Sequence, residues 1–120
     1  MDVIKSDAAP ENRVHALDDY QAAAAGTAIY PAGSLAYLAL GLNGEAGEVA
    51  EIVKRSIRSG KALNQDEIER LVLELGDCLW YVANTARELG VSLSDVASIN
   101  VEKLRSRQAR GMLQGSGDKR

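Results

Sequence analysis

The chain has 120 residues, 46% of them hydrophobic, with no phenylalanine, two prolines and a formal net charge of −3. This length corresponds to one domain with a modest core, and the excess of acidic residues argues against a protein that grips bare nucleic acid electrostatically. No apolar run approaches the roughly 20 residues of a membrane span and no secretory pattern follows Met1, so the sequence favours a cytoplasmic protein without membrane contacts. Its wealth of alanine, leucine and valine favours helices.

The chain begins with a polar segment. Residues 1–16 show no sustained hydrophobic period, so we expect a mobile leader there. A first helix is expected over residues 17–30, closed by Pro31. Gln21 and Thr27 on that helix could face a ligand, although packing or surface roles are favoured for both.

A second helix is expected over residues 35–58, with Ser34 as its N-cap. Its apolar residues recur at steps of three and four and predict one stripe: Leu35, Leu38, Leu42, Ala46, Val49, Val53 and Ile57. Glu45 falls on the edge of that stripe and Glu48 one step further out, and a carboxylate beside core side chains is costly to bury unless a partner compensates it. Three glycines in the helix leave room for another backbone or for a ligand: Gly41, Gly44 and Gly47.

A third helix is expected over about residues 64–89, with Gly90 ending it. Its main apolar arc comprises Ile68, Leu71, Val72, Leu75, Cys78, Leu79, Val82, Ala86 and Leu89. Leu73 and Trp80 point nearly the opposite way, so we expect that second side to face another subunit. A polar seam runs between the two apolar sides: Glu74, Asp77, Tyr81 and Asn84.

Ser92 is the expected N-cap of a fourth helix over residues 93–107. Its inward arc carries Asn100, Lys103 and Arg107, and cations on an inward face need anions. Salt bridges to carboxylates and contacts to a triphosphate both satisfy this need, and the pattern leaves the choice open.

Glycine, serine and charged residues dominate positions 109–120, a composition typical of a flexible basic tail. The expected organisation is therefore a leader over 1–16, a helical domain over 17–108 and the tail. As an alternative to plain disorder, the tail could order as a lid over a bound triphosphate.

Two acid pairs, Glu45 with Glu48 and Glu74 with Asp77, lie on successive helices, each pair spaced by three residues. The segment between the pairs accommodates a helix end, a turn and half of the next helix, so antiparallel helices would bring the pairs face to face. Four carboxylates in an apolar groove repel one another unless cations neutralise them, and oxygen-only ligands suit Mg²⁺ or Mn²⁺. The single cysteine and single histidine exclude an internal disulfide, a thiolate zinc site and a ferritin-type iron site.

With these acids, and with Asn100-x-x-Lys103 and Arg107 downstream, the chain resembles the all-α nucleoside triphosphate pyrophosphohydrolases of the MazG-like superfamily over roughly residues 17–107. The resemblance implies a four-helix-bundle-like domain that assembles as a homodimer or as a homotetramer built from two dimers. It also implies Mg²⁺-dependent hydrolysis of (deoxy)nucleoside triphosphates to a monophosphate and pyrophosphate, with Mn²⁺ as an alternative metal. Many members carry a further glutamate directly before the first motif acid, where this chain has Gly44.

The resemblance also implies roles for individual residues. The expected metal ligands and catalytic residues are Glu45, Glu48, Glu74 and Asp77, one of which would accept a proton from the attacking water. The expected substrate-binding residues are Tyr81, Asn84, Asn100, Lys103 and Arg107. Two other functions stay open: a dUTP- or phosphoribosyl-ATP-type pyrophosphohydrolase of the same fold, and a non-catalytic helical dimerisation module.

Overall fold

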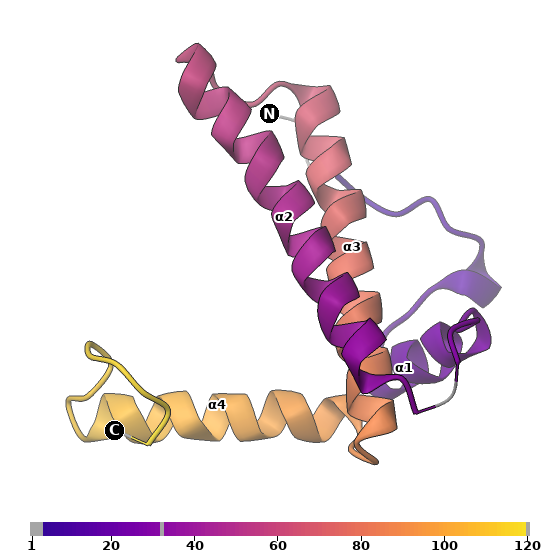
Figure 1. The fold of residues 1–120 in the computed structure, drawn as a ribbon, viewed down its shortest axis with the longest axis vertical. Helices are drawn as coiled ribbons and strands as arrows, with labels where there is room; N and C mark the ends of the chain where they lie inside the picture. Colours follow the sequence, from indigo (N-terminus) through magenta and orange to yellow (C-terminus); the bar gives the residue numbers. More distant parts are fainter. Residues whose placement is uncertain (1–3, 32, 120) are drawn as a thin grey trace.

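A computed structural model describes residues 4–31 and 33–119 of the chain. The described residues form helices and no strand, which confirms the all-α expectation (Figure 1). The elements in chain order are a 3₁₀ turn Pro10–Asn12, α1 Leu17–Gly26, α2 Leu35–Ser59, α3 Gln65–Glu88 and α4 Leu93–Ala109. Within the described ranges, no helix combines the length and the apolar character that crossing a membrane requires.

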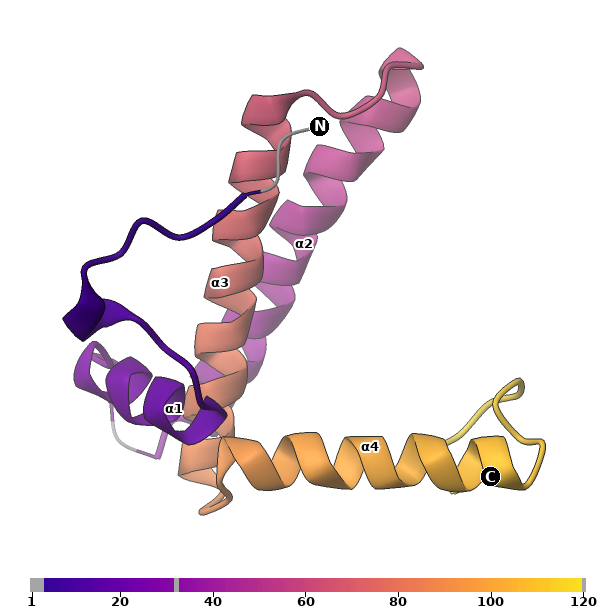
Figure 2. The same ribbon diagram turned by 180° about the vertical axis from the view of Figure 1, so that it is seen from behind.

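The long hairpin of α2 and α3 forms the largest part of the molecule. The two helices run antiparallel side by side in both ribbon views (Figures 1 and 2). Gly60 ends α2 in the left-handed region with φ = 66°. Asn64 and Glu67 then form a reciprocal capping box at the start of α3, each side chain accepting from the other residue's backbone N–H at 2.9 Å. These local signals explain why α2 ends and α3 begins close to where the sequence predicts.

The face of α2 that packs on α3 differs from the predicted apolar stripe. Leu38 and Ile52 are almost fully buried, whereas Leu35 and Ile57 at the two ends of the predicted stripe are exposed. Two helices that pack at a shallow angle stay in contact at every seventh residue. On α2 this spacing selects Leu38, Glu45 and Ile52, which we call the contact line of α2. Glu45 therefore lies between the two helices, and much of the predicted apolar stripe is exposed.

The first helix is shorter than predicted. It ends at Gly26 rather than near Pro31, because the Thr27 hydroxyl accepts a hydrogen bond from the Trp80 indole N–H at 2.8 Å and holds the chain against α3. The expected N-cap Ser34 makes no side-chain capping bond. The end of α1 was therefore predicted incorrectly, whereas α2 begins at Leu35 directly after Ser34, as predicted.

The fourth helix projects away from the hairpin and contacts α1 and α3 but, among the described residues, not α2 (Figures 1 and 2). Ser92 caps it as predicted. The Asp18 carboxylate on α1 accepts from the Ser94 N–H at 2.9 Å and from the Ser94 hydroxyl at 2.7 Å, and these bonds hold the pKa of Asp18 below its usual value. Gln21 Oε1 accepts from the Leu93 N–H at 3.0 Å. Helix α1 thus fixes the direction in which α4 leaves the body.

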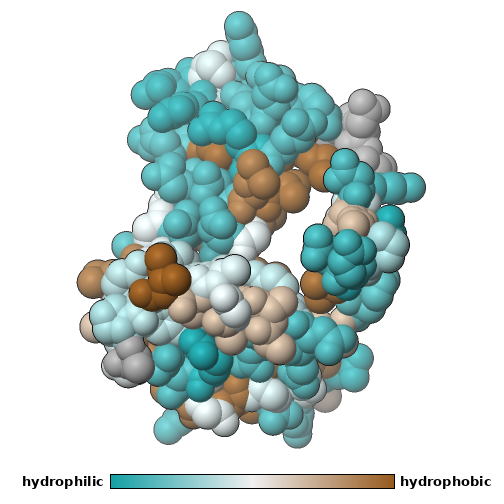
Figure 3. Space-filling view, turned by 90° about the vertical axis from the view of Figure 1, so that its right-hand side faces the viewer, coloured by the Kyte–Doolittle hydropathy of each residue, from teal (hydrophilic) through white to brown (hydrophobic). Residues whose placement is uncertain are grey.

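Residues 4–16 of the predicted leader run along the outside of the molecule. A hollow of about 580 Å³ separates them from the body, with His15, Tyr20 and Gly76 in its lining. Figure 3, from the side of the molecule that bears this segment, shows such an opening beside apolar patches. The first three residues of the predicted leader lie outside the described part of the chain.

Candidate metal centre

The centre of the α2–α3 hairpin brings three carboxylates together. Glu45 comes from the contact line of α2, and Glu74 and Asp77 come from neighbouring turns of α3. One carboxylate oxygen from each of the three lies within 4.8 Å of the others. Glu45 and Glu74 are half-buried and Asp77 is exposed, so the group opens to solvent on one side.

The crowding of these acids affects their protonation. Burial is the largest cause that raises the pKa of Glu45, followed by a hydrogen bond with Glu74 and by the negative charges of Asp77, Glu74 and Glu48. Burial, followed by the charges of Glu45, Asp77 and Glu74, also raises the pKa of the Cys78 thiol. The mutual repulsion of these carboxylates therefore favours a cation among them.

The donor set fits a hard divalent cation. Oxygens on opposite sides of an octahedral Mg²⁺ are about 4.2 Å apart and adjacent ones about 3 Å, because each Mg–O bond is about 2.1 Å. Small side-chain rotations would close the observed spread of up to 4.8 Å around such an ion. With oxygen ligands alone in the group, Mg²⁺ or Mn²⁺ is chemically favoured over zinc or copper.

Glu48 stands outside this group in the structure. The four acids were predicted to converge, but only three of them do, and the Glu48 side chain points from the exposed side of α2. The difference follows from the seven-residue contact line, which places Glu45 between the helices and turns Glu48 one step away from α3. Glu48 is still close enough for its charge to raise the pKa of Glu45.

A pocket of about 300 Å³ opens beside the carboxylates and has an aromatic wall. It is lined by Thr27, Glu45, Asp77, Trp80 and Tyr81. The rings of Trp80 and Tyr81 meet edge to face with centroids 5.0 Å apart. Trp80 was predicted to face another subunit, but it packs on α1 through Thr27 and forms part of this pocket. Helical periodicity gives the direction of Trp80 but not the identity of the element opposite it.

Tyr81 lies where the sequence predicts, next to the acids, and it also packs on the backbone of α2. A side chain at Gly41 would collide with the Tyr81 ring, which explains why this helix position has no Cβ. Burial, followed by the charge and hydrogen bond of Tyr37, raises the pKa of Tyr81. Gly44 and Gly47 have no comparable neighbour within the described chain.

Asn84 does not face the pocket, although it was predicted to bind substrate. It is 1% exposed, and its amide N–H₂ donates to the carbonyls of Ala24 and Trp80 at 3.4 and 3.1 Å. Its side-chain oxygen accepts from the Tyr30 hydroxyl at 3.5 Å. Asn84 therefore fastens α1 to α3 behind the site.

The predicted phosphate-binding residues lie on α4, away from the carboxylates of the same chain. Asn100 is exposed, Lys103 is half-buried and Arg107 is buried. Helix α4 leaves the lower end of the hairpin and extends away from it (Figure 1), so one copy of the chain does not bring these residues to the acids. Lys103 and Arg107 instead contact the tail residue Asp118.

Comparisons with known proteins show the family of the chain. Residues 34–112 match the family model described as the MazG nucleotide pyrophosphohydrolase domain, a span that includes α2, α3 and α4. The chain is 46% identical over 112 residues to the Gene 37 protein of Mycobacterium phage L5, and the alignment covers 87% of this chain and 98% of that protein. No solved structure matches the chain significantly.

Proposed function

Because the chain belongs to the MazG nucleotide pyrophosphohydrolase family, we propose that it hydrolyses nucleoside triphosphates, with Mg²⁺, to a nucleoside monophosphate and pyrophosphate. The observation that carries this proposal is the convergence of Glu45, Glu74 and Asp77 beside an aromatic pocket. Phosphoanhydride cleavage requires neutralised phosphate oxygens and a positioned water, which a metal held by oxygen ligands supplies. The aromatic wall offers a surface for a base or a sugar beside it.

The three clustered carboxylates would hold the metal, with Glu48 as a fourth ligand because its exposed side chain is near Glu45. When bound, Mg²⁺ would neutralise phosphate oxygens and lower the pKa of a water molecule. Trp80 and Tyr81 would pack against the base or sugar and keep bulk water from that side of the substrate. The volume of about 300 Å³ suits part of a nucleotide, so the phosphates would extend towards the open side of the pocket.

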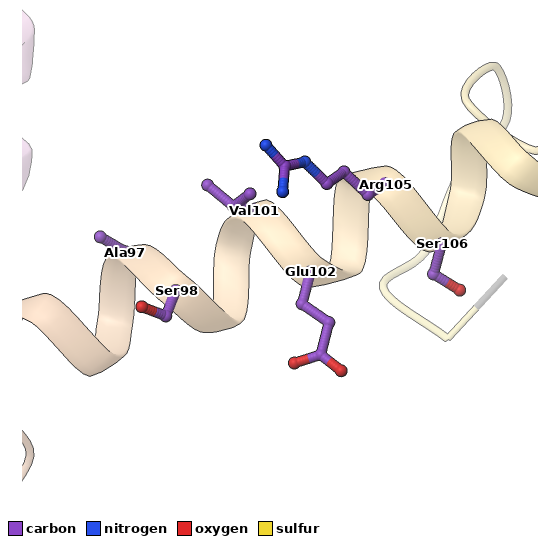
Figure 4. Close-up of a pocket in the computed structure, with 6 residues that line it drawn as sticks. All are labelled: Ala97, Ser98, Val101, Glu102, Arg105 and Ser106. Atoms are coloured by element: carbon purple, nitrogen blue, oxygen red, sulfur yellow. The ribbon is translucent and has the colours of Figure 1, made fainter.

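We further propose that the active form contains at least two copies of the chain. The radius of gyration is 16.9 Å, whereas a compact domain of this length has about 14 Å. Large apolar side chains are exposed on three helices: Leu40, Ile57, Leu73, Leu75 and Ile99. The hollow of about 570 Å³ along α4 is lined by that helix alone (Figure 4). A second copy covering α4 would bury these surfaces and bring Lys103 and Arg107 towards its own carboxylates.

The reaction is tested by phosphorus NMR after incubation of the protein with Mg²⁺ and a panel of eight nucleoside triphosphates. We expect pyrophosphate and a monophosphate as the products, because the proposal places cleavage between the α- and β-phosphates. Orthophosphate with a diphosphate would contradict the proposal. Turnover restricted to dUTP, or to phosphoribosyl-ATP added to the panel, would select the alternative substrates within the family.

The assembly is tested by light scattering of the Ile99→Asp variant. We expect a homodimer or homotetramer for the unchanged protein and a shift to monomer for the variant, because an unpaired charge in an apolar interface is strongly unfavourable. Ile29→Asp is the matched control, since Ile29 is 96% exposed on the connection after α1. A monomeric unchanged protein, or an assembly that resists Ile99→Asp, would contradict the proposed contact through α4.

A further inference from the structure

The tail folds back onto the end of α4. Three glycines with positive φ bend the chain there: Gly111 at 70°, Gly115 at 133° and Gly117 at 85°. The Met112 N–H donates to the Arg107 carbonyl at 2.7 Å, which starts the reversal directly after the helix. The segment for which the sequence predicts flexibility thus follows a definite path beside α4 (Figure 2).

This reversal brings Asp118 to the two cations of α4. Its Oδ1 lies 3.1 Å from Lys103 Nζ and 3.4 Å from Arg107 Nη2, and the Gly117 carbonyl accepts from the same Nη2 at 3.1 Å. Lys103 and Arg107 hold the pKa of Asp118 below its usual value, so the carboxylate is ionised near neutral pH. One oxygen of the Asp118 carboxylate therefore contacts both cations.

The two sides of this contact differ in burial. Arg107 is 4% exposed, and its Nε is buried without a hydrogen-bond partner among the described residues. The Asp118 side chain is 84% exposed. Exposed ion pairs contribute little to stability, whereas a buried donor without an acceptor is costly. The tail itself covers the guanidinium through the Gly117 carbonyl, and the exposed Asp118 carboxylate is the partner that a stronger anion can replace.

A phosphate group would use these donors more fully than Asp118 does. It carries more negative charge than a carboxylate and presents three oxygens, and an arginine fork binds such groups through two parallel N–H bonds. A phosphate at this place could accept from the unused Nε of Arg107 together with Nη2 and still contact Lys103. Phosphate and the Asp118 carboxylate would therefore compete for the same two donors, Lys103 and Arg107.

We propose that Asp118 is an internal competitor of phosphate: the tail holds Lys103 and Arg107 while no ligand is bound and leaves them when a polyphosphate arrives. The inference rests on the proposed function in taking a polyphosphate as the ligand. It is the opposite of a lid, which would close when the triphosphate binds. Asp118 also lies outside residues 34–112, which match the family model, so the proposed competition depends on the tail of this chain.

Calorimetric titration of the full-length protein with inorganic tripolyphosphate, in the absence of Mg²⁺, tests this competition. We expect Asp118→Asn to bind tripolyphosphate about threefold to tenfold more tightly than the unchanged protein, the range expected for the loss of two ion pairs to one exposed carboxylate. Asp66→Asn in the first turn of α3 is the matched control, because it makes the same substitution at an exposed residue on another helix. In NMR spectra, tripolyphosphate should move the Gly117 and Asp118 amide signals of the unchanged protein towards random-coil positions.

Unchanged or weaker binding by Asp118→Asn would overturn the inference, because the tail would then position Arg107 rather than compete for it. Tail amide signals that stay in place while tripolyphosphate binds would overturn it as well. Absence of tripolyphosphate binding in both proteins would remove the anion site and the inference with it. Tripolyphosphate binding without pyrophosphate release from nucleotides would instead contradict only the proposed reaction.

Discussion

Replacing Asp77 by asparagine is expected to lower turnover by a factor of about 10² to 10³. The change removes one of three clustered carboxylates, and a metal ion contributes several kcal/mol of transition-state stabilisation, so poorer metal binding has an effect of this size. The measurement is the initial rate of pyrophosphate release at saturating nucleotide across a Mg²⁺ titration.

The same variant also tests whether the lost activity reflects the metal rather than the fold. Asp77 is exposed, so Asp77→Asn should keep the helical circular dichroism signal, and relief of charge repulsion should leave the metal-free protein at least as stable. Mg²⁺ should raise the melting temperature of the unchanged protein and of the control Asp66→Asn on the same helix, but much less that of Asp77→Asn. Near-normal turnover by Asp77→Asn would show that the cluster is not the metal centre.

The largest effect on stability is expected from Gly41→Ala, which should lower the free energy of unfolding by about 3 kcal/mol, at the upper end of the range for overpacked cores. The added Cβ would overlap the Tyr81 ring, so the ring must move and the α2–α3 contact beside Glu45 must open. Urea unfolding followed by circular dichroism measures the change. Because Tyr81 lines the pocket, a rise in the KM for nucleotide should accompany it.

Gly47→Ala provides the matched control on the same helix. No atom outside its own helix lies within 4 Å of a Cβ at that position in the described chain, so alanine should stabilise α2 by about 0.5–1 kcal/mol through its higher helix propensity. Equal effects at the two positions would contradict the packing described for Tyr81. A loss of stability at Gly47 alone would reveal that a second copy packs there.

The sequence was a good guide wherever the signal is local. Asn64 and Ser92 mark the starts of α3 and α4 because a cap involves only neighbouring residues. The convergence of Glu45, Glu74 and Asp77 could also be predicted, since helical spacing and the length of the hairpin together place the residues. The end of α1 was missed because it depends on the hydrogen bond between Trp80 and Thr27, which are far apart in the sequence.

The location of α4 could not be predicted for a similar reason. Its apolar side chains are spread around the helix, so periodicity does not identify one buried face, and its direction is set by the side chains of Asp18 and Gln21 on another helix. Asn84 shows that a polar residue near a site in the sequence pattern need not face that site. Its position on α3 was predicted correctly, but the Ala24 carbonyl that its amide contacts belongs to α1.

Helix α4 is anchored at one end only, and it can rotate about its first turn, which α1 holds. At a rise of 1.5 Å per residue, Arg107 is roughly 20 Å from the pivot at Leu93, so a rotation of 10° would displace the guanidinium by about 4 Å. A shift of that size separates contact with a phosphate from no contact. The hydrogen bonds of Asp18 and Gln21 thus control an alignment far from either residue. Substitutions at Asp18 or Gln21 therefore offer a way to change the proposed activity without altering the three clustered carboxylates or the two cations of α4.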